Sequence, residues 1–496
     1  MTPPTVTRSL ALAGVLVAAL SLSACDLTEL NEDPNNSAVP TTGYLLSSSQ
    51  VNLADDYWGS FNNGRFGLLY AQYWTQNQYN DEDRYQYREA IPNNYWNGFY
   101  LRINNLEEIK RVISANPEGF SAPETQMAVA EVMQVFAYHV LTDIWGAVPY
   151  TEALQGSEDR APAYTVQEEI YPDLIRRLTA AQAQIDVEAE VPGDLIYGGD
   201  AGEWKKFANS LKMRIAMRMA DRLPSEAATA IQEAIAAGPM EEVEDSAVFS
   251  FEGSQPYSNP IWENYNINNR DDWAVTQGLV SILQGNDDPR LSIYVDPTPQ
   301  SVDAGNPAYV GLPYGLANGV AAAIPRSTFS RPGIRVRRAT SPAILMLYDE
   351  VLFIKAEAVE RGFISGDSDA LLADAVRASF EYWGVTDQAA IDSYIGDLDD
   401  VNGSNYKQVI GVQKWLALYM QGVQGWSEWR RLDFTGVLVP PAGGKGDTFE
   451  GPIPVRYIYP TKEGTLNGGN LAAAVGAQGP DTQGTLLWWD VNRLGS

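Results

Sequence analysis

The spacing of apolar residues constrains this fold more than any other feature of the chain. Between residues 124 and 144, apolar positions follow one another at intervals of four, three and four: Val129, Met133, Phe136 and Val140. This spacing places them on one face of an α-helix, and that face must be buried against another element. Gly146 and Pro149 follow soon after, and both residue types commonly end helices.

The same pattern recurs elsewhere, so helices dominate the predicted fold. The other predicted helices are residues 93–113, 203–221, 341–361 and 406–421. None of them carries a long heptad run, which favours pairs of amphipathic helices over a coiled coil.

Two regions lack this helical period. Residues 247–251 have the pattern of a strand, and the rest of 241–340 mixes Pro, Gly, Asn and aromatic residues, as does 432–496. We therefore predict a mainly α fold with few short strands. Its helical scaffold would lie mainly in residues 41–240 and 341–431, with a loop-rich layer in 241–340 and 432–496. Loops on a rigid scaffold are where binding groups tend to lie.

The N-terminal segment has the features of an export signal. Arg8 precedes an almost purely apolar stretch, residues 10–24, which is too short and wrongly flanked for a stable membrane span. The stretch ends in a sequence that matches the bacterial lipobox, Leu22-Ser23-Ala24-Cys25. In such signals the chain is cut before the cysteine, which is then acylated. Cys25 is the only cysteine in 496 residues, which indicates that the chain keeps it for the chemistry of its sulfur.

We accordingly predict a lipoprotein signal peptide at residues 1–24, a lipidated tether at 25–40 and a folded domain at 41–496. The alternative is an ordinary signal peptide with an incidental cysteine. No other segment approaches 18 consecutive apolar residues, so no second membrane-embedded segment is expected. With one cysteine the chain forms no internal disulfide, and its stability must come from a core.

The charge of the chain excludes some ligands. It has 34 Lys and Arg against 63 Asp and Glu, a formal net charge of −29. Such an acidic chain is a poor match for nucleic acid or for an anionic lipid surface.

Short motifs follow one another in a fixed order over nearly the whole chain after Cys25. They are Asn31-Glu32-Asp33-Pro34-Asn35; Trp96, Tyr100 and Asn104-Asn105; His139 to Ala153 with Asp143, Trp145-Gly146 and Pro149; Glu203 to Arg214; Ala356-Glu357-Ala358 with Arg361-Gly362; Gln413 and Trp415; Glu428-Trp429-Arg430-Arg431; and Arg456 to Pro460 with Glu463 and Asn467. Each motif is weak alone. In this order they resemble the SusD/RagB family of nutrient-binding outer-membrane lipoproteins.

The resemblance implies a fold and a role. The family fold is a set of tetratricopeptide-like helix pairs that carries an irregular ligand-binding portion. Its members are anchored in the outer membrane and face the cell exterior, where they pass glycans or peptides to a SusC-type TonB-dependent transporter. They bind their cargo without cleaving it. The implied function is therefore glycan capture, with peptide cargo as the alternative and a glycosidase or a protein-binding scaffold as more distant ones.

The sequence offers little support for catalysis or for a metal. His139 is the only histidine, and it lies among apolar residues of a predicted helix, which indicates a core role. This excludes His-rich metal sites and most Ser-His or Cys-His catalysis. The acidic loop 397–405 breaks the spacing of an EF-hand and is expected to be a solvated loop. We predict no catalytic residue, no metal and no cofactor.

The best ligand candidates are two aromatic segments, residues 73–80 and 257–273, which also carry amide and Arg side chains. Aromatic faces stack on sugar rings, and amides and Arg pair with hydroxyl groups. The candidate residues are Trp74, Tyr79, Tyr257, Trp262, Tyr265, Asn268, Arg270 and Trp273. We expect the two segments to meet in one exposed aromatic surface. The alternative is that these side chains pack the loops together.

Overall fold

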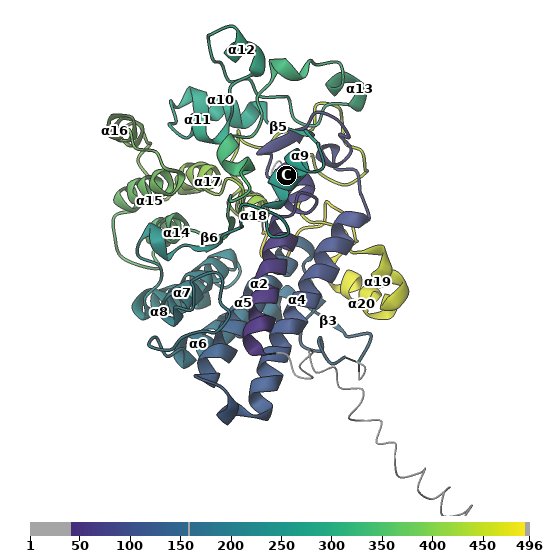
Figure 1. The fold of residues 1–496 in the computed structure, drawn as a ribbon, viewed down its shortest axis with the longest axis vertical. Coiled ribbons are helices and arrows are strands. Elements are labelled where there is room, and N and C mark those ends of the chain that lie inside the picture. Colours follow the sequence, from purple (N-terminus) through teal and green to yellow (C-terminus); the bar gives the residue numbers. More distant parts are fainter. Residues whose placement is uncertain (1–40, 157–158, 492–496) are drawn as a thin grey trace, which may run out of the picture.

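The computed structural model describes residues 41–156 and 159–491, and most of this part is helical. The first half of the chain builds a row of long helices, each packed against the next along the chain (Figure 1). Their bounds are Thr42–Trp58 (α2), Ala90–Ala115 (α4), Pro123–Trp145 (α5), Gln167–Gln184 (α6), Ala201–Arg218 (α7) and Pro224–Ala237 (α8).

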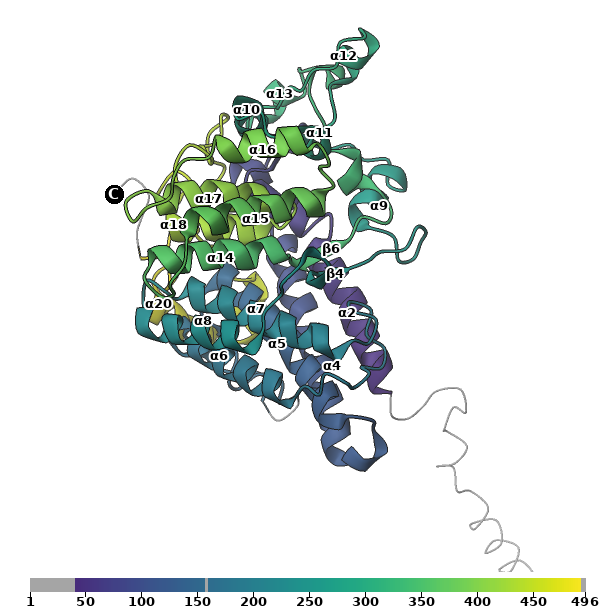
Figure 2. The same cartoon turned by 90° about the vertical axis from the view of Figure 1, so that its left-hand side faces the viewer.

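A second group of helices continues this stack, as Figure 2 shows. They are Tyr348–Glu360 (α14), Ser368–Trp383 (α15), Gln388–Gly396 (α16), Tyr406–Ala417 (α17) and Gly422–Leu432 (α18). Packing of α14 against α7 joins the two groups. Asp367 and Asp387 begin α15 and α16 by accepting hydrogen bonds from backbone N–H groups of the first turn, which a helix leaves unpaired.

The predicted mainly α fold is confirmed, and four of the predicted helices appear within a few residues of their expected bounds, as α4, α5, α7 and α17. The helix predicted at 341–361 is wrong at its start. Ala343–Met346 forms a strand, β6, and pairs antiparallel with β4 (Ala247–Phe249) before α14 begins at Tyr348. All four β6 residues are buried, and a short apolar run fits a buried strand as well as a helix.

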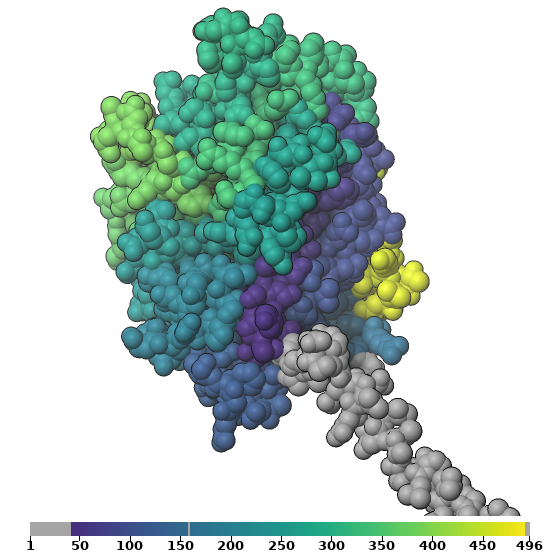
Figure 3. All heavy atoms as spheres, in the orientation of Figure 1, coloured from purple at the N-terminus to yellow at the C-terminus, as the bar shows by residue number. Residues whose placement is uncertain are grey.

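A layer of short elements covers the upper end of the scaffold in Figure 1. It contains Pro260–Asn266 (α9), Gln277–Gly285 (α10), Leu291–Tyr294 (α11), Pro299–Asp303 (α12) and Asn318–Ala321 (α13). Two further strands, Trp74–Gln76 (β1) and Trp273–Val275 (β5), form their own antiparallel pair. Figure 3 shows purple residues, which include α2, at the surface between the teal residues of this layer and the blue residues that follow in sequence.

The remaining elements lie at the side of the scaffold. Strands Val148–Pro149 (β2) and Tyr164–Thr165 (β3) pair with each other, and β3 contacts Gly468–Gln478 (α20), which follows Thr461–Leu466 (α19). Gly146 ends α5 with a φ of 89°, a backbone conformation that glycine adopts without strain. Among the described residues, no helix combines the length and the apolar character that crossing a membrane would require.

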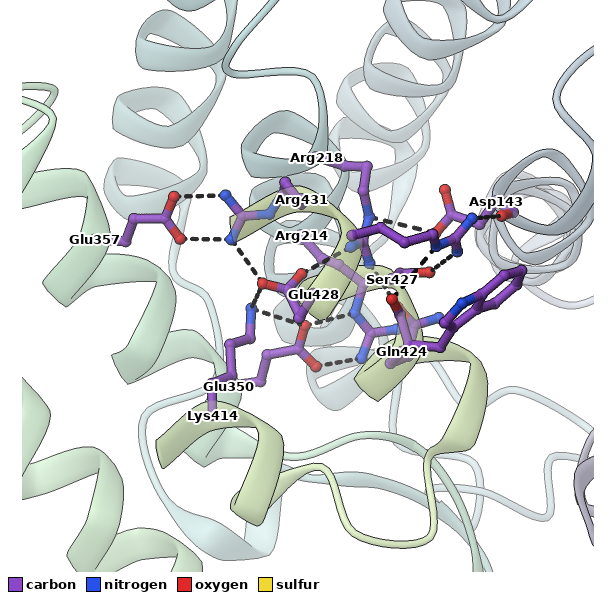
Figure 4. Close-up of polar contacts among 12 residues, drawn as sticks. Asp143, Arg214, Arg218, Glu350, Glu357, Lys414, Gln424, Ser427, Glu428 and Arg431 are labelled. Atoms are coloured by element: carbon purple, nitrogen blue, oxygen red, sulfur yellow. Dashed lines mark hydrogen bonds and ion pairs between the residues drawn. The ribbon is translucent and has the colours of Figure 1, made fainter. Parts of the chain in front are cut away.

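A buried network of ion pairs joins five helices of the scaffold (Figure 4). Its carboxylates and cations are Asp143, Glu350, Glu357 and Glu428 on one side and Arg214, Arg218, Lys414 and Arg431 on the other. Arg431 donates to both oxygens of Glu357, at 2.5 and 2.6 Å. Burial alone would raise the pKa of Glu357, but Arg431 and Arg361 hold it at about 2. Glu357 is therefore ionised at neutral pH.

Most of the motifs on which the resemblance rests contribute to this interior. Arg430 is buried, with its guanidinium 3.5 Å from the centre of the Trp426 ring. It donates to the backbone carbonyls of Asp143 and Val455, both at 2.9 Å, so it pairs with carbonyl groups of distant segments. Trp429 is 4% exposed. These motif residues serve the scaffold and contact no open surface.

His139 is buried in α5, as the sequence predicted for a core histidine. Its Nε2 lies 3.5 Å from Oδ2 of Asp143, and neither ring nitrogen has a hydrogen-bond partner among the described residues. Burial lowers the pKa of His139 to about 4, against the opposing effect of Asp143. The ring is therefore neutral at pH 7.

Candidate functional site

The pairing of β1 with β5 brings together the two aromatic segments that the sequence singled out. Trp74 lies opposite Val275, and Gln76 lies opposite Trp273. The rings of Trp74 and Trp273 are 5.5 Å apart between centroids. Residues almost 200 positions apart in sequence are thus neighbours in the loop-rich layer.

These two tryptophans do not lie on an exposed surface, and this part of the expectation is wrong. Trp74 is 0% and Trp273 is 1% exposed. Every residue of β1 and of β5 is buried, so neither face of the strand pair turns a side chain to solvent. The indole nitrogen of Trp74 donates to the Tyr419 hydroxyl at 3.0 Å. Both tryptophans therefore belong to the buried core of the molecule.

Tyr79 and Arg270 form the exposed part of the same region. Tyr79 is 51% exposed, and the Arg270 guanidinium lies 5.1 Å from the centre of its ring. Arg270 also donates to the buried carboxylate of Asp272 at 2.8 Å, and Asp272 accepts from Arg65 as well. The arginine is therefore held in place while its exposed edge remains available to hydroxyl groups.

The other candidate residues surround α9. Trp262 and Tyr265 are half-buried on this helix, and Asn268 follows it in an exposed turn. Tyr265 packs 6.0 Å from Trp273 and under the guanidinium of Arg337. Tyr257, 48% exposed, precedes the helix. The structure thus leaves Tyr79, Tyr257, Asn268 and Arg270 open to solvent, with Trp262 partly so.

A cleft that the sequence did not reveal adjoins α9. It has a volume of about 450 Å³ and lies between the end of α2, the loop after it, the first turns of α4 and α9. Its polar and aromatic lining comprises Asp55, Asp56, Ser60, Phe61, Asn62, Asn93, Asn94, Asn97, Glu263 and Asn268. Only Asn268 among these was a candidate from sequence. The signal that could have found the others is a helix, α4, whose first turns carry three asparagines.

The cleft is built from fixed side chains. Asp56 accepts from Nε of Arg102 at 3.0 Å, and Glu263 accepts from the Ser258 hydroxyl at 2.6 Å. A Cβ atom at Gly98 would come within 2.7 Å of the Asp56 carboxylate, so a larger residue there would force this side chain to move. Asn62 donates to the backbone carbonyl of Asp56 at 2.6 Å.

Asp55, like Glu263, has no cation as its partner in an ion pair among the described residues. Its pKa is raised to about 6, first because the surrounding protein removes part of its hydration and then because Asp56 and Glu263 are negative. Arg102 opposes this shift.

A larger groove, of about 1020 Å³, runs between α4, α5 and α6. Its charges compensate one another: Lys110 contacts Glu131 at 2.7 Å, and Arg177 forms an ion pair with the same carboxylate. No group of three or more His, Cys, Asp or Glu side chains in the described part of the chain is arranged to hold a metal ion. The surface of Tyr79, Arg270 and α9 with its adjoining cleft is therefore the stronger candidate site.

Solved structures share this architecture. A chitin-binding protein is 26% identical, with a TM-score of 0.81 over 91% of this chain and 100% of its own. A SusD homologue from Bacteroides uniformis is 25% identical, with a TM-score of 0.74 over 90% of this chain and 100% of its own. A chitin-binding SusD homologue from Flavobacterium johnsoniae is 24% identical, with a TM-score of 0.78 over 91% of this chain and 98% of its own.

Comparison with curated proteins gives no match. The profile of the SusD-like family, described as "Starch-binding associating with outer membrane", matches residues 34–460. That match covers most of the scaffold and the whole of the candidate site. The chain therefore belongs to the SusD-like family.

Proposed function

We propose that the protein captures a glycan at the cell surface and delivers it to a SusC-type TonB-dependent transporter in the outer membrane. It would be held there by acyl chains on Cys25, which lies outside the described residues. Its role would be binding, without chemical change to the cargo. Family membership supports the class of this function, and the site geometry supports the glycan.

The observation that carries the proposal is the exposed pair of Tyr79 and Arg270 beside α9. A tyrosine face offers an apolar platform to a sugar ring, and the adjacent guanidinium and the Asn268 amide offer donors to its hydroxyl groups. Trp262 offers a second, half-buried aromatic ring on α9. Trp74 and Trp273 would contribute indirectly, because they are buried in the strand pair of β1 and β5 and stabilise the region next to this surface.

The test measures the binding of soluble oligosaccharides to a chain that starts after Cys25. The chitin tetramer is the first probe, because one structure of this fold is named a chitin-binding protein; a starch hexamer is the second. Tyr79→Ala and Trp262→Ala should each weaken binding about fivefold to tenfold, since loss of one aromatic contact costs on the order of 1 kcal/mol. Tyr44→Ala, at a 76% exposed tyrosine in the first turn of α2, is the matched control.

Normal binding by both site variants would contradict the proposed surface. Binding of peptides but of neither oligosaccharide would favour the peptide cargo that the resemblance left open. Shortened sugars in the mixture would show that the protein is a glycosidase. Melting temperatures of the variants, compared with that of the original chain, separate loss of a contact from loss of the fold.

A further inference from the structure

An arginine-rich segment crosses the loop-rich layer next to α9. Residues 326–338 contain five arginines and no aspartate or glutamate, whereas the whole chain has 34 lysines and arginines against 63 acidic residues. The arginines are Arg326, Arg331, Arg335, Arg337 and Arg338. The turn at Ile334–Arg337 packs against α9. The sign of the charge is therefore reversed in a segment that lies beside the candidate site.

Two of these arginines, Arg326 and Arg331, share a single carboxylate, and we call them the arginine pair. Arg331 donates to Oδ2 of Asp271, and Nη1 of Arg326 lies 3.4 Å from the same oxygen. The two guanidiniums make no other hydrogen bond to a described residue. Their side chains are 37% and 35% exposed. Because a guanidinium carries five N–H donors, most donors of the pair have no acceptor in the described part of the chain, and one carboxylate cannot balance two positive charges.

The same imbalance extends along the neighbouring residues. Asp272 contacts both Arg270 and Arg65, and Glu82 contacts both Arg65 and Arg88. Together with the arginine pair and its carboxylate, five arginines are thus in contact with three carboxylates. Three exposed arginines of the scaffold instead have one carboxylate each, in the pairs Arg111–Glu108, Arg176–Asp173 and Arg377–Asp392. An acidic chain that keeps this surface short of carboxylates leaves positive charge for an anion from outside the protein.

We propose that the arginine pair binds an anionic group of the glycan, either the carboxylate of a uronic acid or a sulfate ester, and that the protein thus captures an acidic polysaccharide. This inference rests on the proposed function and specifies its substrate class. The planar fork of a guanidinium donates two parallel hydrogen bonds to an oxyanion, and such charge-assisted bonds are about twice as strong as neutral ones. The uncharged sugars of starch and chitin offer no such group.

The arginine pair adjoins the aromatic surface of the candidate site. Asp271, which contacts both arginines, directly follows Arg270 in sequence, and Arg270 lies against the ring of Tyr79. The Asn77 amide donates to the backbone carbonyl of Asp271 at 3.0 Å, so the loop after β1 is held beside the pair. Burial raises the pKa of the Tyr265 hydroxyl, and both arginines of the pair are close enough to oppose this rise. A glycan stacked on Tyr79 can therefore extend to the pair.

The formal net charge of −29 is compatible with such a ligand. Charges at the surface are screened over about 10 Å at 0.1 M salt, so an anion in contact with the arginine pair experiences mainly the charges next to it. A local positive surface on an acidic protein suits a short anionic segment of a glycan. It does not suit the extended negative surface of a nucleic acid or of a membrane, which would also meet the carboxylates around it.

The decisive measurement compares tetragalacturonate with its methyl ester, which has the same rings and no charge. In isothermal titration calorimetry at pH 7, the original chain should prefer the acid by about tenfold, as expected for one partly exposed charge-assisted pair. The double variant Arg326→Gln/Arg331→Gln should lose most of this preference. Arg111→Gln removes the same charge from a 47% exposed side chain of α4 and should keep the preference, so it controls for the change in net charge.

Two further variants separate loss of the site from loss of the fold. Arg326→Gln alone removes a guanidinium that makes no hydrogen bond to a described residue, so its melting temperature should match that of the original chain while the preference falls. The double variant Arg326→Lys/Arg331→Lys keeps both charges but loses the planar fork. Its preference should lie between those of the original chain and of the glutamine double variant.

A sulfated carrageenan tetrasaccharide and its desulfated form make a second pair of probes, which distinguishes the two sources of the anion. A preference for the charged member of either pair supports the inference and identifies the anion as carboxylate or sulfate. Equal binding within both pairs, or a full preference in the glutamine double variant, overturns the inference while the glycan function stands. Binding of tetra-glutamate but of no sugar overturns both, and so does a failure of all these probes and of the chitin and starch oligosaccharides to bind.

Discussion

Glu357 illustrates how much a single interior residue contributes to this protein. Its carboxylate is buried, and it accepts hydrogen bonds from Arg431 and Arg361. A charge removed from water in this way is stable only while its partners remain, because the loss of one leaves the other unpaired in a medium of low polarity. The energetic value of such a residue lies in the cost of breaking the pair.

We therefore predict that Arg431→Met lowers the free energy of unfolding by about 3–5 kcal/mol. Chemical denaturation monitored by circular dichroism measures this loss. Arg176→Met is the matched control, because Arg176 pairs with Asp173 at a position where its side chain is 71% exposed. That pair should contribute less than about 1 kcal/mol. Equal losses for the two variants would show that the buried network has no special weight.

The low pKa of His139 predicts that the free energy of unfolding depends on pH. Its pKa is about 4 in the folded chain and 6.5 in the absence of structure, so the unfolded chain binds the proton more readily. Stability from this residue is fully present above pH 6.5 and is lost as the pH falls towards 4, by up to roughly 3 kcal/mol.

The measurement is the free energy of unfolding at several pH values between 7 and 4, for the original chain and for His139→Gln. The variant should show a shallower decline over this interval, because it has no ring to protonate. Asp349 changes in the opposite direction, since burial raises its pKa to about 7, so only the difference between the two proteins isolates His139. Parallel pH curves would refute the assignment.

At the scale of single elements, apolar spacing located α4, α5, α7 and α17, but it did not predict α2, α6, α8, α15, α16 or α18. In α5 and α7 the apolar spacing lies within helices that are buried on nearly every side, since residues 132–145 of α5 and 207–218 of α7 are all buried. The same reasoning failed at β6, where four apolar residues carry no period that separates strand from helix. A short apolar run can be recognised as a strand only when its partner strand is known. The partner of β6 is β4, which lies about 100 residues earlier in the sequence.

Leu211 tests the scaffold at this scale. It is completely buried in α7, the helix that packs against α5, α6, α8 and α14. Leu211→Ala should cost about 2–5 kcal/mol, because the neighbouring helices cannot close the cavity fully. Leu101→Ala, at a 51% exposed position of α4, is the control and should have little effect on denaturation. A small effect at Leu211 would mean that the stack tolerates cavities.

The candidate site was predicted only in part, and the reason is geometric. Composition identified segments that carry aromatic and amide groups, and strand pairing placed them together. Composition could not tell which aromatic side chains face outward, so Trp74 and Trp273 were grouped with Tyr79 although they are buried. Asp55 and Asn93 were missed because both lie on helices of the scaffold, and a cleft between distant helices leaves no local pattern.

At the scale of the whole molecule, the proposed attachment to the membrane would depend on one atom, the Cys25 sulfur. Cys25→Ala should release the protein from the membrane fraction or leave its signal uncleaved, because acylation requires the thiol. Fractionation of cells followed by immunoblotting measures this. Ser23→Thr, which leaves the cysteine intact, is the control. A Cys25→Ala protein that still sediments fully with outer membrane would show that another feature anchors it.

The long reach of the interior contacts has a consequence for how the chain acquires its shape. The Asn63 amide donates to the carbonyl of Met420, 357 positions later, and the Tyr73 hydroxyl donates to Trp415. Because the chain is synthesised from its N-terminus, α5 and α7 are made before α17 and α18, which carry the charged partners of their buried side chains. Contacts this distant in sequence slow folding. Until α17 and α18 have been made, the preceding helices leave apolar surface exposed. This architecture therefore requires protection from aggregation during biogenesis.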